Sequence, residues 1–81
     1  MRIDKSTYHL LTDHAIYIPK PDVKIELAIS DAFEIMEHEH MYVELFFDNV
    51  LLLVQKKSTP ESVLQIYNNK IRMRQKEQIV R

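Results

Sequence analysis

Glycine and cysteine are both absent from the 81 residues of this chain. Glycine supplies the positive φ angles of tight hairpin turns, P-loops and dinucleotide-binding loops, so its absence argues against hairpin-rich β architecture and against those nucleotide motifs. The absence of cysteine excludes disulfides and thiolate metal sites. The longest apolar run covers residues 50–54 and is far too short to span a membrane. The N-terminus has no signal-peptide pattern, so we expect a cytoplasmic protein without membrane association.

The composition predicts a single small folded domain over residues 1–81. Hydrophobic residues make up 46% of the chain and charged residues 28%, which is ordinary for a folded protein. The formal net charge of −1 gives the whole chain no general attraction to nucleic acid, so nucleic acid is not an expected partner. A domain of this size without disulfides buries little surface, which favours self-association into a homodimer or tetramer.

The stretch from Asp22 to Lys57 contains neither glycine nor proline, and its apolar residues recur every three or four positions. This spacing predicts either one long helix over 22–57 or two helices that meet near residues 38–40, where Glu39 interrupts the apolar series. Eight of the twelve acidic residues lie between Asp22 and Asp48, so the predicted helix is acidic. The recurring positions are Ile25, Ile29, Ala32, Met36, Glu39, Val43, Phe46, Val50 and Leu53.

Shorter segments flank this stretch on both sides. Residues 1–21 are expected to form a short helix, followed by a Pro-Lys-Pro linker over 19–21. The β-branched residues at 16–18 leave an extended alternative open for the end of that helix. After the central stretch, Ser58 and Glu61 have capping-box spacing, which predicts a basic helix over 60–80. The expected fold class is therefore all-α, a helical hairpin or four-helix-type bundle completed by oligomerisation.

Four carboxylates of the central stretch have the spacing of a metal site. Glu44 and Asp48 lie four residues apart on one face of the predicted helix, and Asp31 and Glu34 lie three apart on the preceding segment. Two such pairs on facing helices would converge on Mg²⁺, which prefers carboxylate and phosphate oxygens. The alternative is that acidic and basic helices simply present solvated faces. Glu37 and His40 have the Glu-x-x-His spacing of di-iron bundles.

From Glu44 to its end, the chain resembles the last two helices of the MazG-like, all-α nucleoside triphosphate pyrophosphohydrolases. The matching segments are Glu44-Leu45-Phe46, the apolar run that ends at Val54, and Val63-Leu64-Gln65-Ile66-Tyr67-Asn68-Asn69-Lys70, with Arg74 four residues later. The resemblance implies an all-α fold, Glu44 and Asp48 as catalytic metal ligands, and Lys70 and Arg74 as phosphate-binding residues. Where the family has the glutamate of its Glu-x-x-Asp pair, this chain has Met41 if Glu44 takes the place of the aspartate, or Leu45 if Asp48 does. A folded but inactive member is therefore an alternative.

Two functional hypotheses follow from these patterns. In the first, Mg²⁺ held by Asp31, Glu34, Glu44 and Asp48 activates water, and the basic helix stabilises charge while a nucleoside triphosphate is hydrolysed. In the second, the chain is a non-enzymatic helical dimer that acts as a regulatory module and binds a protein partner. His9 and His14 have no evident partners in the sequence and are expected at the surface.

Overall fold

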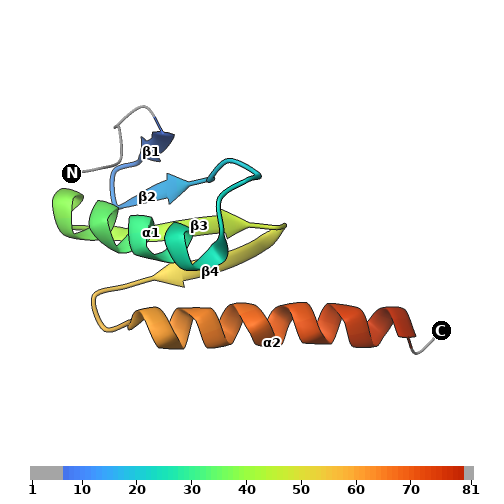
Figure 1. The fold of residues 1–81 in the computed structure, drawn as a ribbon. Helices are drawn as coiled ribbons and strands as arrows, with labels where there is room; N and C mark the ends of the chain where they lie inside the picture. Colours follow the sequence, from blue (N-terminus) through green and yellow to red (C-terminus); the bar gives the residue numbers. More distant parts are fainter. Residues whose placement is uncertain (1–6, 80–81) are drawn as a thin grey trace.

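The computed structural model describes residues 7–79, with side chains as far as Arg74. It contains four strands and two helices in the order shown in Figure 1. The elements are β1 (Tyr8–Leu10), β2 (His14–Tyr17), α1 (Ile25–Glu39), β3 (Tyr42–Phe47), β4 (Val50–Val54) and α2 (Pro60–Ile79). The prediction of an all-α helical bundle is therefore wrong, because the chain has an α+β fold.

The four strands form one mixed sheet in the order β1-β2-β3-β4. The outer pairs are antiparallel hairpins, whereas β2 and β3 are parallel and are connected through α1. Figure 1 shows α1 lying across one face of the sheet and α2 running beside β4. Both helices contact each other, so together they cover one face of the sheet and its β4 edge.

The hairpin between β3 and β4 turns without glycine. Asp48 and Asn49 form a two-residue loop with φ angles of 53° and 62°, the left-handed geometry of a type I′ turn. Aspartate and asparagine tolerate this region better than other non-glycine residues. The absence of glycine therefore does not exclude hairpins in this chain, contrary to the prediction.

The predicted helix over 22–57 is wrong beyond residue 39. Helix α1 ends at Glu39, and its C-cap His40 takes a left-handed φ of 57° and donates its backbone N–H to the Met36 carbonyl at 2.9 Å. The chain then enters β3, where buried Val43 and Leu45 alternate with more exposed neighbours. The chain does change direction near residues 38–40, but the segment that follows forms two strands and not a second helix.

The predicted short helix within residues 1–21 is also wrong where the structure describes it. Residues 8–17 form the β1–β2 hairpin, which pairs Tyr8 with Tyr17. A hydrogen bond of 2.8 Å from the Leu11 N–H to the His14 carbonyl closes its turn. The extended alternative for the β-branched residues after Ala15 fits this strand. Residues 1–6 lie outside the described part of the chain.

The core lies between the sheet and the helices. Its largest fully buried side chains come from α1, β3 and β4, with Ile35, Leu45 and Leu52 all at most 1% exposed. The buried apolar residues are Tyr8, Ala15, Tyr17, Ala28, Ile29, Ala32, Ile35, Val43, Leu45, Val50, Leu52, Val54 and Val63. Burial of these side chains away from water is the main driving force for this fold.

Helix α2 occupies the range predicted for the basic helix, except for residue 80, which lies outside the described residues. Its cap differs from the prediction: the hydroxyl groups of Thr59 and Ser62 each accept the other residue's backbone N–H at 3.1 Å. Further along α2, Lys70 donates to the Leu51 carbonyl at 2.8 Å and Arg74 to the Asp48 carbonyl at 3.1 Å. These contacts occupy backbone acceptors of β4 and its turn, which protects that edge.

Candidate functional site

The four predicted metal ligands lie on different sides of the sheet. Asp31 and Glu34 belong to α1, and Asp31 is buried beneath the sheet, where its carboxylate accepts a hydrogen bond from the Tyr17 hydroxyl at 3.2 Å. Glu44 alternates with buried Val43 on β3 and therefore points to the opposite face. Within the described residues, no group of three or more His, Cys, Asp or Glu side chains is placed to hold a metal ion. The structure thus does not bring Glu44 together with the acids of α1.

The predicted phosphate-binding residues lie beside Asp48 at the β3–β4 turn. An Arg74 guanidinium nitrogen lies 3.8 Å from the Asp48 carboxylate, in addition to its hydrogen bond to the Asp48 carbonyl. Burial raises the pKa of the nearby Tyr67 hydroxyl, and the negative charge of Asp48 raises this pKa further. Lys70 binds the Leu51 carbonyl and so points to the strand edge. Asp48, Lys70 and Arg74 therefore lie near the same turn, and both cations already contact oxygen atoms of the protein.

A second acidic network connects α1 to the β1–β2 hairpin. The Tyr8 hydroxyl donates to Glu39 at 2.5 Å, in parallel with the hydrogen bond from Tyr17 to Asp31. Burial, the hydrogen bond to Glu39 and the charge of Glu39 together raise the pKa of Tyr8 to about 12. These two hydrogen bonds connect α1 to the sheet, so Asp31 and Glu39 have a structural role.

The face of the sheet away from the helices carries a polar cluster. His14 lies between two carboxylates, with Nδ1 at 2.8 Å from Asp13 and Nε2 at 3.0 Å from Glu44. Its ring stacks on Tyr42 of the neighbouring parallel strand, with ring centres 4.9 Å apart and planes 3° from parallel. These four residues, Asp13, His14, Tyr42 and Glu44, are called the His14 cluster below.

The electrostatics of the His14 cluster favour the charged imidazolium. The hydrogen bond to Asp13 raises the pKa of His14, and the charge of Glu44 raises it further against the opposing effect of burial. The same hydrogen bond lowers the pKa of Asp13. Only the protonated ring can donate to both carboxylates at once. In that form neither nitrogen has a free lone pair, and each N–H points to a carboxylate.

Next to the His14 cluster, the same face of the sheet exposes large apolar side chains. We call this face the open face, because no helix or strand among residues 7–79 covers it. Phe46 and Leu51 are directly paired across β3 and β4, and Leu53 lies two pairs further along, opposite Glu44. The exposed apolar residues, here called the apolar patch, are Ile18 (62% exposed), Phe46 (37%), Leu51 (42%) and Leu53 (43%).

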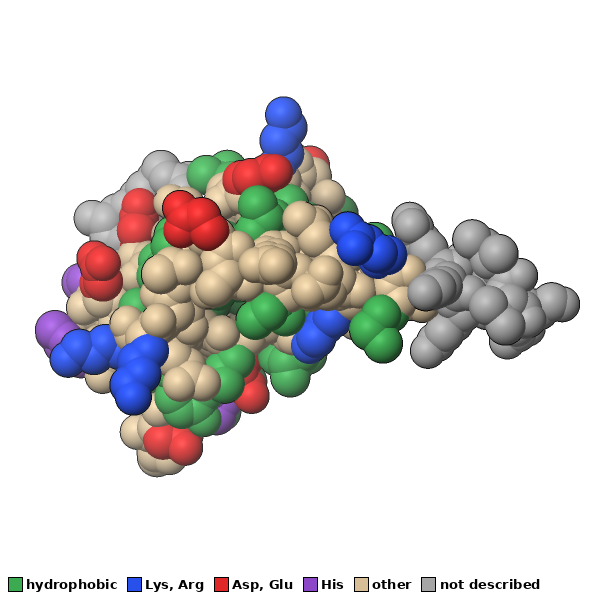
Figure 2. All heavy atoms as spheres, turned by 90° about the horizontal axis from the view of Figure 1, so that it is seen from below, with side chains coloured by type: hydrophobic (Ala, Val, Ile, Leu, Met, Phe, Trp, Pro, Cys, Tyr) green, Lys and Arg blue, Asp and Glu red, His purple; other side chains and the backbone are tan. Residues whose placement is uncertain are grey.

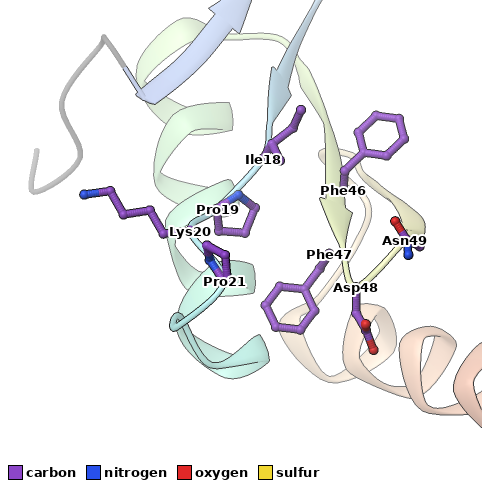
Figure 3. Close-up of a pocket in the computed structure, with 8 residues that line it drawn as sticks. All are labelled: Ile18, Pro19, Lys20, Pro21, Phe46, Phe47, Asp48 and Asn49. Carbon is purple, nitrogen blue, oxygen red and sulfur yellow. The ribbon is translucent and has the colours of Figure 1, made fainter.

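A groove of about 650 Å³ opens at the end of the sheet where the apolar patch lies. It runs between the segment Ile18–Pro21 and the β3–β4 turn. Figure 3 shows Ile18 and Phe46 pointing to the same side, whereas Phe47 lies on the side that faces Pro21. The lining is aromatic and aliphatic apart from Lys20, Asp48 and Asn49, so the groove extends the apolar patch to the edge of the sheet.

Other surfaces of the molecule are mixed in character. Figure 2 shows the side that α2 occupies, where charged side chains of both signs are interspersed with hydrophobic ones. A second hollow of about 610 Å³ lies at the opposite end of the sheet, between the end of α1 and the end of β4. It contains two methionines beside His40, the residue that sequence spacing pairs with Glu37. Both of those residues line the hollow without forming a metal-binding group in the described part of the chain.

Sequence reasoning missed His14 and the apolar patch. The prediction placed His14 at the surface without partners, because Glu44 is 30 residues away in the chain. Alternation along residues 14–17 and 42–46 is the signal that places both side chains on one face, and it is readable only once these segments are recognised as strands.

Neither helix in the described region combines the length and the apolar character that a membrane span requires. Comparison of the chain with known protein families, curated proteins and solved structures finds no match in any of the three. Functional inference therefore depends on the geometry of the open face and of the groups around it.

Proposed function

We propose that this protein is a non-enzymatic contact module that binds a protein partner through the open face of its sheet. The observation that supports this proposal is the apolar patch, whose four large side chains are between 37% and 62% exposed on β3, on β4 and directly after β2. Antiparallel sheets with one solvated face normally carry polar residues there. Contiguous exposed apolar side chains on a soluble domain mark interaction surfaces.

The surroundings of the patch resemble the anatomy of a protein interface. The His14 cluster borders the apolar residues on the open face, with Glu44 directly opposite Leu53, and it can act as a polar rim. Glu44 is paired with His14, so docking does not leave an isolated carboxylate against the patch. Phe46 is an aromatic side chain near the middle of the patch, which is the type of residue that often dominates binding energy.

The hydrolase hypothesis stays a prediction with less support from the geometry. Its acids are divided between the two faces of the sheet, and its cations already bind backbone carbonyls of β4 and the turn. The all-α fold that the MazG-like resemblance implies is not the fold of this chain. A shared Mg²⁺ site formed by Asp31, Glu34 and Glu44 would require side chains to meet across the sheet.

Site-specific photo-crosslinking in cells that express the chain tests the contact module. Phe46→p-benzoylphenylalanine places a reactive group in the apolar patch, and Leu27→p-benzoylphenylalanine places it on a similarly exposed position of α1. We expect discrete covalent adducts with protein from position 46 and none from position 27. Absence of adducts at position 46, or the same adducts at both positions, would reject the proposal.

The hydrolase hypothesis is tested in parallel by measuring pyrophosphate release from nucleoside triphosphates in the presence of Mg²⁺. The contact module predicts no release above the rate without protein. Release that depends on Mg²⁺ and is abolished in both Glu44→Gln and Asp48→Asn would overturn a non-enzymatic function. Glu61→Gln, at an exposed position in the first turn of α2, is the matched control for loss of one carboxylate.

A further inference from the structure

We infer that the partner on the open face is a second copy of this chain, which gives a homodimer with two sheets packed face to face. This inference rests on the proposed contact module and names its partner. It uses the shape of the apolar patch, the charge of the chain and the size of the open face.

The apolar patch is suited to pack against itself. Its residues lie directly after β2, on β3 and along β4 of the open face. In a two-fold dimer the same patch is used by both subunits, so a patch of one chemical type is self-complementary. An axis that passes over Phe46 and Leu51 would set aliphatic and aromatic side chains against their own kind and leave both His14 clusters near the rim.

The charge of the chain permits this association. A formal net charge of −1 produces little repulsion between two copies. The patch contains no charged residue, and the nearest carboxylate on the open face, Glu44, lies 3.0 Å from Nε2 of His14. Because Glu44 already has a hydrogen-bond partner within its own subunit, the dimer contact does not have to supply one.

The size of the open face agrees with a small but specific interface. Four strands about 4.8 Å apart, with about five residues of 3.3 Å each, give a face of about 300 Å² in projection. Side chains that interdigitate across two such faces bury more surface than the projection. The total falls at the low end of specific interfaces, near 1,200 Å² or less. We therefore expect a reversible dimer with a dissociation constant in the micromolar range.

Sedimentation equilibrium on the purified full chain, from about 1 to 500 µM, measures this association directly. We expect the wild-type chain to shift from monomer to dimer across this range. Leu51→Glu and Leu53→Glu each place a carboxylate in the dimer contact and should raise the dissociation constant at least about 30-fold. Ile66→Glu, on α2 with the same exposed fraction within a few per cent, should leave the dissociation constant within about twofold.

Circular dichroism and thermal unfolding of dilute samples show that each variant is folded. A wild-type chain that stays monomeric at 500 µM would reject the homodimer. A dimer that Ile66→Glu dissociates as strongly as Leu53→Glu would also reject it, because the contact would then involve α2. Adducts from position 46 with a protein other than this chain, together with a monomeric purified chain, would keep the contact module and reject only self-association.

Discussion

The two faces of the sheet differ in environment far more than in sequence. On β4, Leu52 is 1% exposed beneath the helices, whereas Leu53 is 43% exposed on the open face. The residues are chemically identical neighbours, so composition cannot explain the difference. The direction of successive side chains, together with the placement of α1 and α2 on one side, decides which leucine belongs to the core. One face therefore holds the fold together, and the other is left for contact.

The largest expected effect is on the free energy of unfolding, when a leucine on each face of β4 is replaced in turn. Leu52→Ala should lower the free energy of unfolding by about 2 to 5 kcal/mol, since it removes a core side chain and leaves a cavity. Leu53→Ala should change the free energy of unfolding by no more than about 0.5 kcal/mol in dilute, monomeric samples. Urea titration followed by circular dichroism measures both values. Equal losses in the two variants would show that the open face is covered in solution.

A smaller effect is confined to alkaline pH and involves the buried face. Because the pKa of folded Tyr8 is raised to about 12 from an ordinary value near 10, the protonated hydroxyl stabilises the folded state. This contribution is fully present below about pH 10 and is lost as the pH rises to about 12. Tyr8→Phe should remove that part of the pH dependence, as measured by denaturant unfolding at pH 9, 10 and 11. An unchanged slope in Tyr8→Phe would contradict the assigned role.

The smallest effect concerns the His14 cluster on the open face. The raised pKa of His14 means that its contribution to stability is present below about pH 6.5 and is lost as the pH rises through the folded pKa. NMR titration of the His14 ring should give a pKa above 6.5. Glu44→Gln should lower that pKa, and Asp13→Asn should lower it more, because the Asp13 hydrogen bond is the strongest influence. A pKa that neither substitution moves would show that the cluster does not form.

The sequence indicated the helices better than the strands. Apolar spacing from Ile25 onward predicts the part of the chain that forms α1, and the Thr59-Pro60 boundary predicts the beginning of α2. Residues 50–54 are apolar on both faces of β4, so the alternation typical of a half-solvated strand is hidden. Val43 and Val50 fit both a helical and a strand register, which extended the predicted helix into β3 and β4.

The open face could not be predicted from sequence for a related reason. Phe46 and Leu53 are residues that the helical pattern assigns to a buried apolar series, so their exposure depends on an unexpected sheet. The β3–β4 turn was hidden because Asp48 and Asn49 supply positive φ angles that glycine usually supplies. The proximity of Asp48 to Arg74 depends on the way α2 returns along β4, which residue spacing alone does not reveal.

The most direct test of the open face is an isotope-filtered NOE experiment on a mixture of labelled and unlabelled chains at a concentration where wild type is dimeric. Self-association through the apolar patch predicts intermolecular contacts from Phe46, Leu51 and Leu53, and none from Ile66 or Met73 on α2. Intermolecular contacts that involve only the α2 residues, or none at any concentration, would contradict the assignment of this face as the contact surface.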